Sequence, residues 1–127
     1  MKRCMRPLMP MPIHLALFVS ADAYFRECRR LKINGADAFV PNDSNACCHY
    51  FENDTTGMTY AMVCVDLKKM EGKDGIGIAS TIIHESVHIY QECLSYIGEK
   101  NPGDEFEAYS IQHIAEQLLR AYVELTS

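Results

Sequence analysis

The sequence predicts an α+β domain, and three observations carry this prediction. Three segments have apolar residues at helical spacing, two neighbouring segments have the composition of β-strands, and the connections are rich in Gly, Pro, Asn and Asp. The chain has 127 residues, which is a usual length for one domain. We therefore expect a single domain over residues 1–127, with an N-terminal helix, an antiparallel β-hairpin or small sheet, and two C-terminal helices.

The first third of the chain contains one predicted helix. Residues 1–12 are rich in Met and Pro and are expected to form an extended arm, and residues 13–19 fit either a strand or a first helical turn. From Ser20, a residue type that caps helices, apolar residues recur at spacings of three and four. The dipeptide Asn34-Gly35 favours the end of this helix.

A β-hairpin is predicted next. Residues 46–52 and 58–66 are rich in aromatic, β-branched and Cys residues, which is typical of strands. Residues 53–57 are turn formers, and Gly57 can adopt the positive φ that such connections need. The two strands are therefore expected to pair antiparallel.

Two helices are predicted in the last third of the chain. After a Lys- and Gly-rich loop over residues 68–77, residues 81–97 have apolar side chains at spacings of three and four, and Gly98 favours a stop. A short turn leads to a helix from about residue 105 to the end, with Asp104 as its cap. The short connection predicts that these two helices are an antiparallel pair.

The charge distribution excludes some classes of partner. The net charge is −5, and residues 81–127 carry two basic and eight acidic side chains. A nucleic-acid backbone is bound by clustered Lys and Arg, so we expect no nucleic-acid partner. The sequence also has no uncharged apolar stretch long enough to cross a bilayer, so we expect no membrane partner.

The six cysteines indicate the compartment. There is no C-x-x-C pair, and Cys28, Cys64 and Cys93 lie in apolar-patterned segments, where a free Cys behaves as a small hydrophobic residue. We therefore expect a reducing, cytoplasmic location. The alternative is secretion through an N-terminal signal, because basic residues precede the apolar residues 13–19 and an Ala-Asp-Ala sequence. Pro and His residues in and beside the apolar run favour a retained N-terminus.

The strongest functional signal is an H-E-x-x-H motif, His84-Glu85-Ser86-Val87-His88, on the predicted helix 81–97. Residues four apart lie on the same face of a helix, so both imidazoles can bind one Zn²⁺ ion. Glu85 is rotated by about 100° from His84, where it can reach a water beside the metal. The motif predicts a site for one zinc ion. The alternative is two solvent-facing histidines on an amphipathic helix.

A zinc site of this type needs a third protein ligand. Glu107, just inside the last predicted helix, is the candidate, because the antiparallel helix pair can bring it back towards His88. Glu107 has a second interpretation, since with Asp104 it has the form of a capping box that only stabilises the helix start. Glu105 is the competing candidate for the third ligand.

The motif followed by Glu107 resembles the gluzincin branch of the zinc metallopeptidases. The chain is also similar to small metallopeptidase-like proteins encoded by tailed phages and prophages, through residues 83–91, 97–99, 104–109 and 111–114. The resemblance covers about residues 80–122. Ile111 departs from it, because many larger gluzincins have an Asp at that position.

The resemblance implies a minimal zincin-like domain in which an edge strand lines the cleft beside the motif helix. It implies one Zn²⁺ ion held by His84, His88 and Glu107, with Glu85 as general base. The implied function is a zinc-dependent hydrolase, a small metallopeptidase acting on a peptide or protein substrate in the cytoplasm, that of the host cell if the chain is phage-encoded. The alternative is a non-catalytic, zinc-stabilised phage protein that binds a host target.

Further groups have weaker functional interpretations. His113 and Tyr109 could support the site from beyond the metal ligands or donate a hydrogen bond to the transition state, although a surface histidine and a packing tyrosine are the simpler interpretations. His49 lies beside Cys47 and Cys48, where a second metal site is a minor alternative to an ordinary strand histidine.

Overall fold

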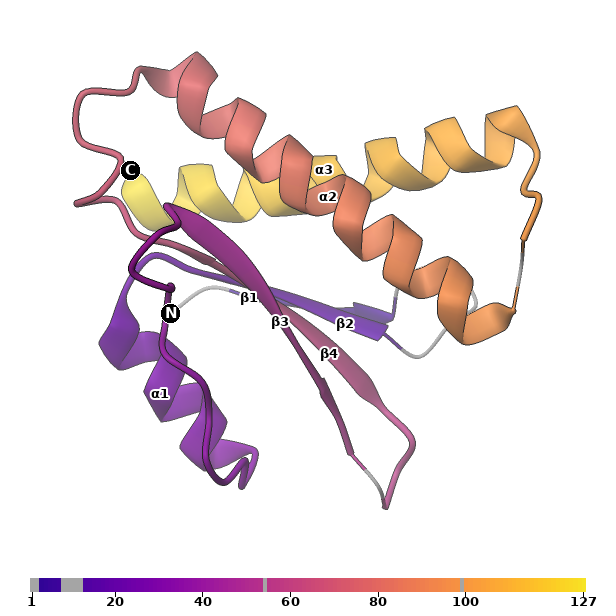
Figure 1. Ribbon diagram of the computed structural model, residues 1–127, viewed down its shortest axis with the longest axis horizontal. Coiled ribbons are helices and arrows are strands. Elements are labelled where there is room, and N and C mark those ends of the chain that lie inside the picture. Colours follow the sequence, from indigo (N-terminus) through magenta and orange to yellow (C-terminus); the bar gives the residue numbers. More distant parts are fainter. Residues whose placement is uncertain (1–2, 8–12, 54, 99) are drawn as a thin grey trace.

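A mixed β-sheet with helices on both faces organises the part of the chain that the computed structural model describes, residues 3–7, 13–53, 55–98 and 100–127. Within these residues the sheet has four strands in the order β1-β2-β4-β3 (Figure 1). The strands are β1 (Arg3–Pro7), β2 (Ile13–Phe18), β3 (Ala46–Glu52) and β4 (Thr59–Val65). The predicted α+β class is confirmed.

The strand pairing confirms one prediction and adds to another. β3 and β4 pair antiparallel from Ala46 opposite Val65 to Glu52 opposite Thr59, as the hairpin prediction requires. Residues 13–19, which fitted either a strand or a helical turn, contain strand β2, and this strand pairs in parallel with β4. Residues 3–7 of the predicted arm form edge strand β1, antiparallel to β2, and the remainder of the arm lies outside the described residues.

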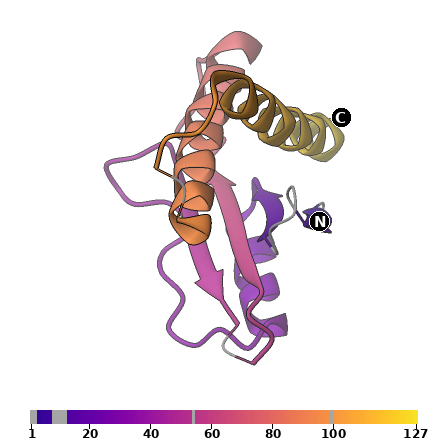
Figure 2. The ribbon, with the colours of Figure 1, turned by 90° about the vertical axis from the view of Figure 1, so that its right-hand side faces the viewer.

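The two central strands separate two apolar clusters. Odd-numbered residues of β2 and β4, such as Leu17 and Val63, face helices α2 (Gly75–Ile97) and α3 (Asp104–Thr126). Even-numbered residues, such as Phe18 and Met62, face helix α1 (Ala21–Arg30). This alternation follows from the two-residue period of a strand, and it gives the molecule three layers (Figure 2).

The first two helices begin at side-chain caps. The Ser20 hydroxyl accepts a hydrogen bond from the Ala23 amide at 3.3 Å, as expected for α1. Helix α2 begins at Gly75 instead of residue 81, because the Asp74 carboxylate accepts a hydrogen bond from the Gly77 amide at 2.8 Å. The last part of the predicted 68–77 loop is therefore helical. Gly98 ends α2 with a φ of 68°, as predicted.

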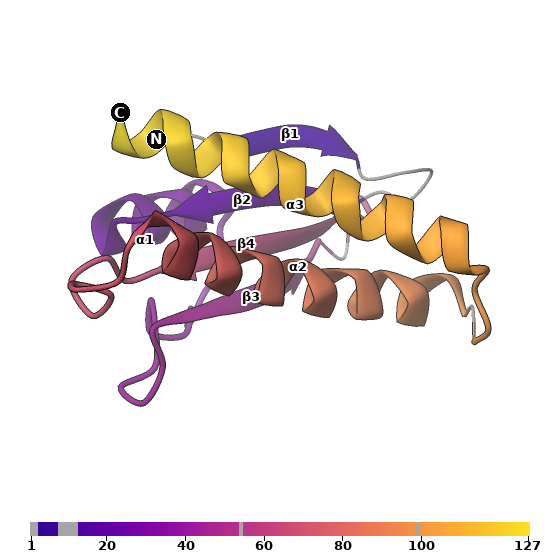
Figure 3. The ribbon, with the colours of Figure 1, turned by 90° about the horizontal axis from the view of Figure 1, so that it is seen from above.

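Helix α3 corrects the prediction for its start. Gly103 is the N-cap and makes no side-chain hydrogen bond, and Asp104 is the first helical residue instead of the cap. Seen from above, α3 lies over β1 and β2 and α2 lies towards β3 (Figure 3). Among the described residues, none of the helices combines the length and apolarity that crossing a membrane requires.

The packing of Leu17 predicts a large loss of stability on truncation. Leu17 lies on β2 with 0% exposure, so Leu17→Ala leaves a cavity between the sheet and the α2–α3 layer and should cost about 2–5 kcal/mol. Urea unfolding measures the loss as a lower midpoint. The control is Ile76→Ala, since Ile76 is 77% exposed and should change stability by roughly 0.5 kcal/mol or less. Equal losses in the two variants would contradict the assigned core.

Candidate functional site

The motif histidines meet on the exposed side of helix α2. The Nε2 atoms of His84 and His88 lie 3.1 Å apart, with the rings at 79° to one another. Nδ1 of His88 lies 3.2 Å from the side-chain oxygen of Gln91, an acceptor that favours a hydrogen on Nδ1. With its hydrogen on Nδ1, the His88 ring has an unprotonated Nε2, which can accept a hydrogen bond from Nε2 of His84 or bind a metal.

The spacing of the two nitrogens suits a shared zinc ion. Two Zn–N bonds of roughly 2.0–2.1 Å whose nitrogens lie 3.1 Å apart enclose an angle of about 98°, close to the tetrahedral value. The histidine pair therefore fits the metal that the sequence predicts. Among the described residues, no group of three or more His, Cys, Asp or Glu side chains is arranged to hold an ion, so the complete predicted ligand set is not gathered.

Glu107, the predicted third ligand, lies on the first turn of α3 and is exposed. The capping-box interpretation of this residue is wrong, because Gly103 is the cap and makes no side-chain cap bond. The ring of Phe106, the preceding residue, lies 6.4 Å from the ring of Tyr90, two residues past His88 on α2. The start of α3 therefore packs beside the end of the motif. Glu105 is exposed on the same turn.

Glu85 occupies a different environment from the histidines beside it. Its side chain is buried, with 7% exposure, whereas His84 and His88 are exposed. Burial raises the pKa of the Glu85 carboxyl, and the two histidines oppose this effect. A carboxylate with a raised pKa is a stronger base than an exposed one, which is the property that a general base needs.

Glu85 and His88 line a cleft of about 320 Å³ between helix α2 and the edge strand β3. The remaining lining residues are Ala46, Cys47, Cys48, Tyr50, Gln91 and Glu92. The strand that borders the cleft is thus the sheet edge beside the motif helix, the arrangement that the resemblance implies. His84 is not among the lining residues.

Tyr50 is a cleft residue that the sequence interpretation missed. Its hydroxyl is buried against the Cys48 thiol and makes no well-formed hydrogen bond among the described residues. Burial raises the pKa of Tyr50, so the hydroxyl keeps its hydrogen and is a donor. The only sequence signal was its alternate position on the predicted strand 46–52, because alternate residues share one face.

The two candidate donors named from the sequence lie elsewhere. Nε2 of His113 lies 2.9 Å from Nε2 of Gln117, one turn further along α3. Tyr109 is 65% exposed. Neither residue lines the cleft between α2 and β3. His113 is a surface histidine, as its simpler interpretation states. The packing interpretation of Tyr109 is wrong, because its side chain is largely exposed.

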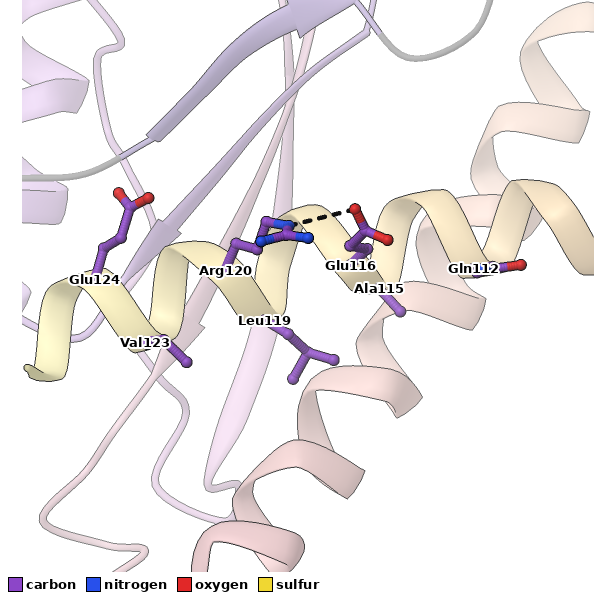
Figure 4. Close-up of a pocket in the computed structure, with 7 residues that line it drawn as sticks. All are labelled: Gln112, Ala115, Glu116, Leu119, Arg120, Val123 and Glu124. Carbon is purple, nitrogen blue, oxygen red and sulfur yellow. Dashed lines mark hydrogen bonds and ion pairs between the residues drawn. The ribbon is translucent and has the colours of Figure 1, made fainter.

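A larger hollow of about 480 Å³ lies along the outer side of α3 (Figure 4). Its lining residues all belong to α3, and they include the exposed Val123 and an ion pair at 3.3 Å between Arg120 and Glu116. None of the predicted site residues contributes to it. The cleft beside the motif is therefore the candidate site.

Comparisons with known proteins identify no relative. No protein-family model matches the chain, and searches of curated proteins and of solved structures returned no match. The function is therefore inferred from the residues and their geometry.

The burial of Glu85 predicts that neutralising it stabilises the metal-free protein. Its folded-state pKa is raised, so the carboxyl favours folding when protonated, and this contribution is lost as the pH rises through the folded-state pKa. In a chelator, Glu85→Gln should melt higher than wild type at pH 7 to 8, and the difference should shrink towards pH 4. Thermal melts across this range measure it. Exposed Glu105→Gln is the control and should not raise the melting temperature; a lower melting temperature for Glu85→Gln at pH 7 would contradict the assignment.

Proposed function

We propose that this chain is a zinc-dependent hydrolase that cleaves peptide bonds, with His84, His88 and Glu107 holding the ion and Glu85 acting as general base. The observation that carries the proposal is the approach of the two Nε2 atoms to 3.1 Å next to a buried glutamate that lines a cleft. Two histidines that only face solvent would not need a buried glutamate beside them. A zinc ion held there supplies Lewis acidity towards the scissile carbonyl and lowers the pKa of the attacking water.

Glu85 moves the proton in this proposal. Its carboxylate accepts a proton from the attacking water and then donates it to the nitrogen of the leaving amine, a role that typically contributes 10²–10⁴-fold to the rate. Burial raises the pKa of this carboxyl and so brings that pKa closer to the pH at which accepting and donating the proton are both efficient. Gln91 holds the His88 ring in the orientation that its ligand role requires.

The edge strand β3 is the proposed binding surface for the substrate main chain. In the described residues β3 pairs on one side only, with β4, so its other edge is available to a further strand. An extended peptide can add there through backbone hydrogen bonds, which read the main chain and leave side-chain preferences to the cleft. Tyr50 and Glu92 line the cleft beside this edge.

A reducing location is part of the proposal. The described cysteines Cys28, Cys47, Cys48, Cys64 and Cys93 are free thiols, which suits the cytoplasm, or a host cytoplasm if the chain is phage-encoded. The peptide or protein substrate would be found in the same compartment.

The proposal predicts that zinc binding and turnover separate in two variants. Glu85→Gln should retain one zinc ion per chain and lose at least 100-fold in hydrolysis of a denatured protein, because it removes the base and leaves the ligands. His88→Ala should lose both zinc and activity. Elemental analysis and a peptide-release assay measure the two properties. Zinc in wild type with no hydrolysis of any peptide substrate would overturn the enzyme assignment and favour a zinc-stabilised binding protein.

The third-ligand assignment predicts different outcomes for two neighbouring glutamates. Glu107→Gln replaces an anionic oxygen with a neutral amide, so zinc affinity should fall by more than the roughly 10–100-fold that follows loss of a residue supporting a ligand. Chelator should then no longer lower its melting temperature, because zinc binding no longer adds to folding. Glu105→Gln, exposed on the same turn, is the matched control and should bind zinc as wild type does. Unchanged affinity in Glu107→Gln together with lost affinity in Glu105→Gln would transfer the assignment to Glu105.

A further inference from the structure

A cluster of thiols and one imidazole lies on the α1 side of the sheet, apart from the motif histidines. Cys47 and His49 are two residues apart on β3, so their side chains lie on the same face of the strand. The Cys47 sulfur lies 3.3 Å from Nε2 of His49, which is hydrogen-bonding distance for this pair. From the sequence, a second metal site at these residues was a minor alternative to an ordinary strand histidine. Among the described residues, no group of three or more metal-ligating side chains is arranged to hold an ion.

The surroundings of His49 hold its ring against the Cys47 sulfur. The ring stacks on Tyr24 of α1, with centroids 5.0 Å apart and an angle of 27° between the planes. Its Nε2 lies 3.0 Å from the carbonyl oxygen of Phe39, which also accepts a hydrogen bond at 3.2 Å from Cys47 in its thiol form. This carbonyl favours a hydrogen on Nε2, where it can be shared with the sulfur. Imidazole groups in this position stabilise a thiolate.

The protonation of the pair agrees with this geometry. A hydrogen bond from the Cys64 thiol and then the neighbouring His49 lower the pKa of Cys47 to about 5, against the opposing effect of burial. Cys47 in turn raises the pKa of His49. Asp37, in the loop after α1, also acts on both members of the pair. Cys28 acts on their neighbours Tyr24 and Cys64. Cys47 and His49 therefore each shift the other towards its charged form.

Cys64 lies directly opposite Cys47 in the β3–β4 register. Opposed residues of an antiparallel pair have Cα atoms about 4.5–5.5 Å apart and side chains on the same face. This separation lies within the roughly 4.4–6.8 Å that a disulfide requires. The strand register therefore permits a disulfide between Cys47 and Cys64.

The two thiols differ in access. Cys47 is half-buried on the outermost strand of the sheet, so its side chain is partly open to solvent. Cys64 is fully buried, with 0% exposure, so solvent reagents do not reach it directly. An accessible thiolate beside a protected second thiol is the arrangement of an attacking and a resolving cysteine.

We propose that Cys47 is a hydroperoxide-reactive thiol, and that Cys64 resolves the oxidised form to a disulfide that joins β3 and β4. This site uses neither the motif histidines nor Glu85, although Cys47 borders the same cleft. Its substrate class is hydrogen peroxide or a small organic hydroperoxide.

The reaction balances in two steps. The Cys47 thiolate attacks one peroxide oxygen, a sulfur–oxygen bond forms and the oxygen–oxygen bond breaks, and the leaving oxygen takes the His49 proton to become water or an alcohol. The product is a sulfenic acid at Cys47, and the peroxide has been reduced by two electrons. The Cys64 sulfur then attacks the Cys47 sulfur, a disulfide forms, and the hydroxyl leaves as water with the Cys64 proton.

The test treats the folded chain with hydrogen peroxide and maps disulfides after alkylation under non-reducing conditions. Wild type should form the Cys47–Cys64 disulfide, and Cys47→Ser should not. Cys64→Ser, or Cys64→Ala if the serine variant does not fold, should stop at a sulfenic acid on Cys47 that a 1,3-dione reagent traps. His49→Gln should slow oxidation of Cys47 about tenfold or more, because the thiolate loses its partner.

Cys48→Ser is the matched control, since Cys48 is adjacent on β3 but points to the α2 side, and it should oxidise at Cys47 as wild type does. A disulfide that joins any other pair, or equal oxidation rates in wild type and His49→Gln, would overturn the proposal. Zinc content and peptide hydrolysis are measured on the same samples, so failure of this site is distinguished from failure of the hydrolase proposal.

Discussion

Burial of the two central strands on both faces is the constraint on which the rest of this structure depends. β2 and β4 pair in parallel, and nearly every residue of both strands is buried. A parallel pair buried in this way needs cover on each side. Helix α1 covers one face, and α2 and α3 share the other. Because α3 occupies the β1–β2 side, α2 lies beside the edge strand β3, and the cleft forms between them.

Much of the fold could be predicted because the signals for it are local. The Ser20 cap, the turn formers between β3 and β4, and Gly98 each act within a few residues. The errors have physical reasons as well. Glycines before residue 81 suggested a loop, but the Asp74 cap lets the helix begin there. The parallel partner of β2 lies more than forty residues away in the chain, and no local pattern specifies it.

The candidate site divides in the same way. The pairing of His84 with His88 follows from helical spacing, and the structure brings their nitrogens together. The position of Glu107 depends on how α3 packs against α2, which spacing alone does not determine. Tyr50 enters the cleft only because β3 pairs with β4 in one register, and a shift of one residue would turn it to the α1 side. The opposition of Cys47 and Cys64 depends on the same register.

The place of the motif within its helix has a consequence for local opening. Helix α2 has 23 residues, and the motif occupies its middle, with about two and a half turns on either side. Helix ends fray in fast, low-energy fluctuations, whereas central turns open only when larger units of the fold open with them. The amides around Ser86 should therefore exchange their hydrogens among the slowest of the helix, and the buried side chains of Ile82 and Ile89 reinforce this protection. The helical turn that carries the two histidines therefore stays folded while the ends of the helix open and close.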